Sequence, residues 1–148
     1  MKNMVLYTLL VAASIIYPKE KTDVGKLRPV EVVHIYKGNQ VMIATDTGDM
    51  GRGSSIKEAL EDLKGTTPGT VYLDTADFLL ISESCIEEIG NIKPIVRGNT
   101  RICIAEPNVD LTKAAEYLSV HKPETKLNET DGKRIQHLKI KNGSLKLE

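Results

Sequence analysis

The segment that decides the fold runs from Gly51 to Glu83 and reads GRGSSIKEALEDLKGTTPGTVYLDTADFLLISE. It joins a glycine-rich turn, one short helix and an apolar strand. Ser55 and Glu58 have the spacing of a capping box, in which a hydroxyl and a carboxylate each accept a hydrogen bond from an unpaired N–H at the start of a helix. We therefore expect a helix to begin directly after Ser55.

The body of this helix carries one apolar stripe, because its apolar residues recur at intervals of three and four. Gly65 is expected to end the helix in the left-handed conformation that a C-terminal cap requires. Pro68 and Gly69 predict a turn, and Val71–Ile81 predicts one long strand that is buried on much of both faces. The stripe consists of Ile56, Ala59, Leu60 and Leu63.

The remaining chain predicts further strands and helices that pack around this unit. Asn142-Gly143 lies between two alternating runs and favours a two-residue type I′ turn, so Leu138–Leu147 is expected to form a hairpin. The other expected elements are strands at Val30–Tyr36, Val41–Ala44 and Arg101–Ala105, a short helix near Ile86–Gly90 with Ser84 as its cap, a helix capped by Asp110, and loops at Thr45–Gly53 and Glu124–Lys133. The sequence thus predicts an α+β fold, with a mixed sheet, two or three helices and a C-terminal hairpin. We expect one domain over residues 1–148, with residues 134–148 either part of it or an appendage.

Composition argues against a nucleic-acid partner. Of the 148 residues, Lys and Arg number 20 and Asp and Glu number 20, so the chain has no net field to attract a polyanion. Aromatic residues make up only 4%, which leaves few platforms for base stacking. Two cysteines, Cys85 and Cys103, are too few for a disulfide scaffold, and we expect two buried free thiols rather than a single bridge.

An apolar run at Met4–Tyr17 has two interpretations. Its length matches the core of a signal peptide and is too short for a membrane span. Its β-branched and aromatic residues also suit an interior strand, which is the interpretation we favour. No cysteine directly follows the run, so we expect no lipid-attachment site of the bacterial lipoprotein type.

Several motifs have the composition of a functional site. The turn before the helix, formed by Gly51, Arg52, Gly53, Ser54 and Ser55, is a candidate anion site because free N–H groups at a helix start attract negative charge. Asp46-Thr47-Gly48 follows an apolar strand, as in retroviral-type aspartic peptidases, in which two carboxylates share a proton. The three histidines are scattered along the chain, and the acidic residues near Asp46 are too few for a calcium loop. We expect no metal and no cofactor.

The segment Thr47–Leu63 resembles part of the N-terminal domain of Ger(x)C-type spore-germination proteins. The resemblance rests on a glycine-rich loop followed by a helix with a Glu58-Ala59-Leu60 core and a later leucine, Leu63. It extends over about Val5–Leu118, through these segments: Leu80-Ile81-Ser82-Glu83, Ile86-Glu87-Glu88-Ile89, the Arg97 region, Ile102-Cys103-Ile104-Ala105 and the helix with Ala114-Ala115.

This resemblance implies a non-catalytic binding or assembly module, similar to a domain of spore-germination receptor subunits. It implies a location at the cell envelope or spore membrane surface, where a partner would supply the membrane contact; without the resemblance we expect a cytoplasmic protein. The expected partner is another protein or a second copy of the chain, joined through a sheet edge. The alternatives are a peptidase that uses Asp46 and a small anion-binding domain that uses Gly51–Ser55.

Overall fold

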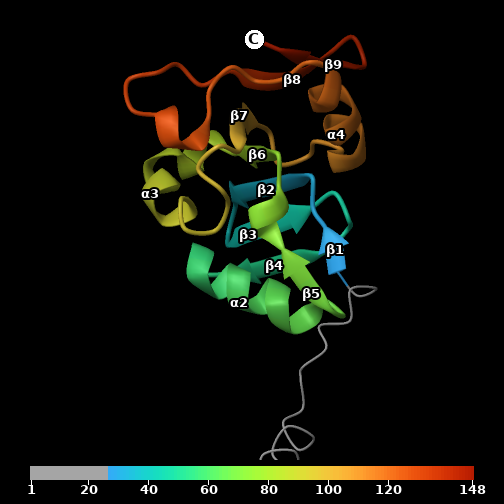
Figure 1. Cartoon of the computed structure of the whole chain (residues 1–148), viewed down its shortest axis with the longest axis vertical. Coiled ribbons are helices and arrows are strands. Elements are labelled where there is room, and N and C mark those ends of the chain that lie inside the picture. Colours follow the sequence, from blue (N-terminus) through green and yellow to red (C-terminus); the bar gives the residue numbers. More distant parts are fainter. Residues whose placement is uncertain (1–26) are drawn as a thin grey trace, which may run out of the picture.

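The computed structural model describes residues 27–148, so the apolar run at Met4–Tyr17 lies outside the described part. A seven-stranded mixed sheet forms its centre, in the order β4-β3-β2-β6-β7-β8-β9 (Figure 1). The strands are β2 (Val32–Lys37), β3 (Val41–Thr45), β4 (Met50–Gly53), β6 (Phe78–Ile81), β7 (Arg101–Ala105), β8 (His137–Lys141) and β9 (Ser144–Leu147). The middle strands β2, β6, β7 and β8 are parallel, and each end of the sheet is an antiparallel addition.

Within residues 27–148, three α-helices and three 3-10 turns connect these strands. They are α2 (Ile56–Thr66), α3 (Ile89–Ile92), α4 (Leu111–Val120), η2 (Leu73–Thr75), η3 (Glu83–Glu88) and η4 (Leu127–Glu129). A second, two-stranded sheet pairs β1 (Leu27–Pro29) with β5 (Thr70–Tyr72) in parallel. The protein is therefore an α+β structure with a C-terminal hairpin, as the sequence predicts.

The central strands bury both faces, because alternate residues of a strand point to opposite sides of the sheet. Figure 1 shows α3 and α4 on opposite sides of the sheet. On the first face, α2, η3 and α3 contribute Ala59, Leu63, Cys85 and Ile92 to a cluster with the sheet residues Val33, Ile35, Leu79, Ile81, Ile102 and Ile104. On the second face, α4 contributes Ala114, Ala115 and Leu118 to a cluster with Val32, Phe78, Leu80, Cys103 and Ala105.

Helix α2 begins as the capping box predicts. Ser55 Oγ accepts a hydrogen bond from Glu58 N at 3.2 Å, and the Glu58 carboxylate reaches back to Ser54, whose N–H and hydroxyl donate at 2.9 and 2.6 Å. Ile56, Ala59 and Leu63 are buried, whereas Leu60 is only partly buried. The stripe is confirmed, with Leu60 at its margin.

Two expectations for the segment after this helix are wrong. Gly65 lies inside the last turn of α2, and the helix ends at Thr66 with Thr67 in an extended conformation. The single strand expected at Val71–Ile81 is split into β5 and β6 by η2. Thr75 stabilises the break. Its hydroxyl donates a hydrogen bond to Tyr72 O at 2.7 Å and accepts one from the N–H of Val30. The break allows β5 to pair with β1 while β6 enters the main sheet.

Other parts of the chain match the sequence in outline and differ in detail. The loop expected at Thr45–Gly53 contains the edge strand β4. The helix near Ile86 is a 3-10 turn that leads into α3, and Ser84 is not its cap. Asp110 caps α4 as expected, with its carboxylate accepting from the N–H groups of Thr112 and Lys113. Asn142 and Gly143 have φ of 52° and 74°, as a type I′ turn requires.

Side chains from helices occupy backbone groups on both outer edges of the sheet. On β4, Arg52 N donates to the Asp62 carboxylate of α2 at 2.8 Å. On β9, Leu147 N donates to the Tyr117 hydroxyl of α4 at 3.1 Å. The ends of the sheet therefore present fewer free backbone groups than bare edge strands would.

Candidate functional site

Strands β6 and β7 are parallel neighbours in the sheet. The segment that follows β6 and the segment that follows β7 pack on opposite faces of the sheet. After β6 the chain enters η3, which packs on the first face, and after β7 it turns toward α4 on the second face. A crevice forms at the carboxyl ends of parallel strands at such a point, and ligands of open α/β sheets bind there. This arrangement makes the region beyond Ile81 and Ala105 the candidate site.

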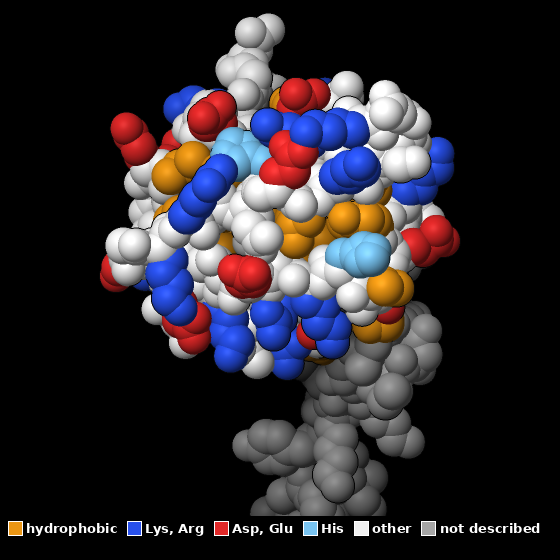
Figure 2. Space-filling model, turned by 90° about the horizontal axis from the view of Figure 1, so that it is seen from above, with side chains coloured by type: hydrophobic (Ala, Val, Ile, Leu, Met, Phe, Trp, Pro, Cys, Tyr) orange, Lys and Arg blue, Asp and Glu red, His pale blue; other side chains and the backbone are white. Residues whose placement is uncertain are grey.

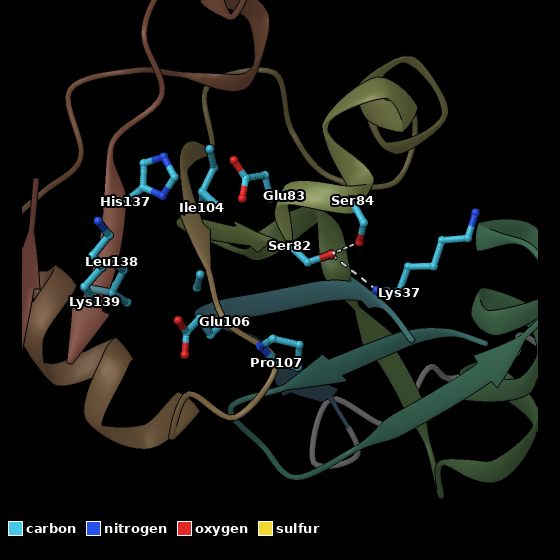
Figure 3. Close-up of a pocket in the computed structure, with 11 residues that line it drawn as sticks. Lys37, Ser82, Glu83, Ser84, Ile104, Glu106, Pro107, His137, Leu138 and Lys139 are labelled. Carbon is cyan, nitrogen blue, oxygen red and sulfur yellow. Dashed lines mark hydrogen bonds between the residues drawn. The ribbon is translucent and has the colours of Figure 1, made fainter. Parts of the chain in front are cut away.

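A hollow of about 540 Å³ occupies this position. It is the size of a small-ligand or peptide-binding pocket. Figure 3 shows β8 on one side of it and the ends of β6 and β2 on the other. Its floor is apolar, with Ile104, Ala105 and Leu138 buried, and polar side chains surround the floor. The lining is Lys37, Ser82, Glu83, Ser84, Ile104, Ala105, Glu106, Pro107, His137, Leu138 and Lys139.

Ser82 holds the β2–β6 side of the crevice rigid. Its hydroxyl accepts a 3.3 Å hydrogen bond from Lys37 N, lies 2.8 Å from Ser84 Oγ and donates to Cys85 Sγ at 3.3 Å (Figure 3). Only 6% of Ser82 is exposed. A hydroxyl with three such partners is part of the local framework.

Within the described chain, the cations that line the crevice have ion-pair partners, whereas two of its carboxylates do not. Lys37 Nζ lies 3.6 Å from the Glu88 carboxylate, and Lys139 Nζ lies 3.7 Å from that of Glu148, so both cations have partners. Glu83 and Glu106 are exposed, and within residues 27–148 neither carboxylate has a hydrogen-bond or ion-pair partner. The unpaired charge of the crevice is therefore negative.

The crevice does not assemble a nucleophile with a base. Figure 3 places His137 across the hollow from Ser82 and Ser84. In the described chain no hydrogen bond joins the His137 ring to either serine. Nucleophilic catalysis needs these groups within hydrogen-bond reach.

The candidate anion loop has an internal structural role. Gly51 and Gly53 belong to β4 and lie against α2: a Cβ on Gly51 would stand 2.2 Å from Ala59 O, and one on Gly53 would stand 2.6 Å from Ala59 N. The glycines allow this strand to approach the helix closely. Arg52 N is bonded to Asp62, and the Glu58 carboxylate takes the Ser54 N–H. Anion binding by Gly51, Arg52, Gly53, Ser54 and Ser55 remains a prediction, and the chain's own carboxylates use two of the donors it would need.

The candidate peptidase residue Asp46 is also engaged with the backbone. Its Oδ1 accepts hydrogen bonds from Glu31 N and Val32 N, each at 3.1 Å, and its own N–H donates to Val32 O. These bonds fasten the end of β3 to the start of β2. The carboxylate oxygen that a peptidase dyad would direct toward its partner carboxylate therefore already accepts two backbone N–H groups.

A buried histidine was not singled out by sequence reasoning. His34 is 1% exposed on the second face of β2, and its Nε2 has no hydrogen-bond partner among the residues described. Burial lowers the pKa of His34 to about 4, opposed in part by a hydrogen bond to the Ala105 backbone. His34, Tyr36, Asp46 and Asp49 line a smaller hollow beside α4. The sequence feature that could have indicated this buried histidine was its position within an apolar strand.

The two cysteines are free and buried, as expected. Cys85 belongs to the cluster on the first face and Cys103 to the cluster on the second, so the sheet separates them. Burial raises the pKa of the Cys103 thiol to about 12, which leaves it protonated and unreactive at neutral pH.

No family model matches the chain, and no match was found among curated proteins or solved structures. Within residues 27–148 no group of three or more His, Cys, Asp or Glu side chains is placed to hold a metal ion. None of the helices that the structure describes has the length and apolar character needed to cross a membrane.

Sequence reasoning missed the crevice itself. Its residues come from four strands that are distant in the sequence, and no local motif joins Lys37, Ser82, Glu106 and His137. The available signal was the placement of polar residues directly after apolar strands, at Ser82-Glu83 and at Glu106.

Proposed function

We propose that this chain is a non-catalytic binding module that recognises a protein partner in the crevice beyond β6 and β7. The observation that carries the proposal is the hollow at the point where the two connections diverge, with an apolar floor and unpaired carboxylates. The resemblance to the N-terminal domain of Ger(x)C-type proteins supports the same class and suggests a germination receptor assembly as the setting.

The surface around the crevice suits a protein partner better than a nucleic acid. Figure 2 looks onto the end of the molecule that carries the β8–β9 hairpin, and it shows Lys and Arg interspersed with Asp and Glu around exposed apolar side chains. Ile140 in β8 is 56% exposed. Interfaces between proteins combine such apolar centres with polar rims, whereas nucleic-acid surfaces carry clustered positive charge.

The test is photo-crosslinking in the cells that produce the protein. The crosslinker p-benzoylphenylalanine replaces Glu106 at the crevice in one variant and Glu61, exposed on α2, in the matched control. We expect one discrete protein adduct from the Glu106 position and none from Glu61. Absence of an adduct at Glu106, or the same adducts from both positions, would contradict the proposal. Mass spectrometry of the adduct then decides whether the partner is a germination receptor subunit.

A further inference from the structure

We propose that the crevice binds its partner as an extended strand, which adds to the inner edge of β8 and presents basic side chains to Glu83 and Glu106. This inference rests on the proposed binding function and specifies the form and charge of the partner segment. It depends on the register of β8 with its two neighbours.

Strand β8 extends past the end of β7, the strand on its inner side. Its ladder with β7 contains only Ile104↔His137 and Ala105↔Leu138, after which β7 ends and the chain turns away at Glu106. On its outer side β8 continues to pair with β9 as far as Lys141↔Ser144. The inner edge of β8 is thus uncovered from Lys139 onward, beside the crevice.

The hydrogen-bond pattern shows which backbone groups point into this gap. His137 and Glu148 exchange both N–H···O bonds, at 2.8 and 2.9 Å. In an antiparallel ladder, hydrogen-bonded pairs alternate with pairs that are not hydrogen-bonded. Lys139 and Lys141 therefore also direct their backbone N–H and C=O groups toward β9. Ile140 consequently directs its N–H and C=O the opposite way, to the side where β7 has ended. These groups are available to a strand that enters the crevice.

This inner edge differs from the outer edges of the sheet. On the β4 edge, Arg52 N donates a hydrogen bond to Asp62, and on the β9 edge Leu147 N donates one to Tyr117. In residues 27–148 no side chain bonds the Ile140 backbone. The fold therefore covers both outer edges in part and leaves the short inner edge free.

The charge of the crevice sets the chemistry of the incoming segment. Glu83 follows β6 and Glu106 follows β7, so the two unpaired carboxylates come from connections that leave on opposite faces of the sheet. Consecutive residues of an extended strand also point to opposite faces. Two adjacent basic residues in one strand would therefore direct one cation toward each carboxylate. Exposed ion pairs of this kind contribute about two- to five-fold each to affinity.

The experiment uses the full chain, labelled with ¹⁵N, and blocked hexapeptides. The probe is acetyl-Val-Thr-Lys-Lys-Thr-Val-amide, with a Glu-Glu version as the charge control and a version N-methylated at alternate residues as the backbone control. We expect the lysine peptide to shift the Ile140 amide signal and the signals of Ser82 to Glu83 and of Glu106, with no shift at Lys57 on α2. We expect the glutamate and N-methylated peptides to produce no shift.

Protein variants separate the two parts of the inference. Glu83→Gln and Glu106→Gln should each weaken binding of the lysine peptide about two- to five-fold. Ile140→Pro removes the inner N–H without removing a bond to β9 and should abolish binding; if this variant does not fold, the N-methylated peptide gives the same answer. No shift with the lysine peptide, or equal shifts with the N-methylated one, would overturn the strand-addition inference. A crosslinked partner at Glu106 would then leave the binding function standing, whereas failure of both experiments removes both.

Discussion

The N–H of Leu147 in the last strand donates a 3.1 Å hydrogen bond to the hydroxyl of Tyr117 in α4. Leu147 pairs with Leu138 at a position where the backbone groups of β9 point away from β8, so this N–H faces the outer edge of the sheet. A helix side chain thereby occupies the donor that a neighbouring strand would use. Self-association through a sheet edge, which the apolar hairpin predicts, must displace this bond on β9.

The variant Tyr117→Phe tests this protection. Loss of the hydroxyl should lower the free energy of unfolding by about 0.5–1.5 kcal/mol, the net value of one hydrogen bond. It should also increase dimer formation, because the Leu147 N–H becomes available. Urea unfolding and sedimentation velocity measure the two effects. Tyr72→Phe is the control, since the Tyr72 hydroxyl has no hydrogen-bond partner in the described chain; equal behaviour of both variants would contradict the prediction.

Alanine substitutions at three glycines test whether each glycine is required by close packing of its neighbours. Gly51→Ala should destabilise by about 1–3 kcal/mol or more, because its Cβ would meet the Ala59 and Leu63 backbone at 2.2 and 2.5 Å. Gly38→Ala is the matched control, with no atom within 4 Å of the new Cβ. Gly65→Ala should stabilise by about 0.4–1 kcal/mol, because Gly65 lies within α2 and a Cβ there has free space. Thermal unfolding of the three variants measures this order, and a stable Gly51→Ala would refute the packing argument.

The leucines of α2 should differ in their contribution to stability. Leu63 is fully buried against the sheet, so Leu63→Ala should cost about 2–5 kcal/mol. Leu60 is only partly buried, and Leu60→Ala should cost clearly less. Chemical denaturation of both variants measures the difference, and equal losses would contradict this assignment of Leu60 to the margin of the stripe.

The sequence predicts local structure well where one or two residues determine it. The Ser55–Glu58 cap, the Asp110 cap and the Asn142-Gly143 turn are all present, because each depends on contacts within four residues. The break at Leu73–Thr75 escaped prediction because, besides its local bond to Tyr72 O, Thr75 bonds Val30, which is 45 positions away. The crevice escaped for the same reason: the ends of four strands meet only after the sheet has formed.

Burial of His34 should make stability depend on pH in a defined window. Its pKa is about 4 in the folded protein against an ordinary value of 6.5, so between these values the unfolded chain binds the proton more readily. The stability that depends on neutral, buried His34 is therefore complete above pH 6.5, decreases as the pH falls and is lost below pH 4, with a loss of about 2 kcal/mol by pH 5. Urea unfolding at pH 7 and pH 5 measures the loss. His34→Gln should remove most of it, whereas the exposed control His121→Gln should keep it; an unchanged loss in His34→Gln would assign it to other groups.

Asp46 separates the structural interpretation from the peptidase alternative. If its carboxylate serves only to accept the N–H groups of Glu31 and Val32, Asp46→Asn keeps an acceptor oxygen and should cost about 1 kcal/mol, while Asp46→Ala leaves two donors unpaired and should cost about 1–3 kcal/mol. Neither variant nor the wild type should then cleave a generic peptide pool at acidic pH. A peptidase instead requires an ionised and a protonated carboxylate to act together, so the wild type would cleave and Asp46→Asn would not. That second pattern would overturn the binding-module proposal, because the residue that now fastens β3 to β2 would be the catalytic one.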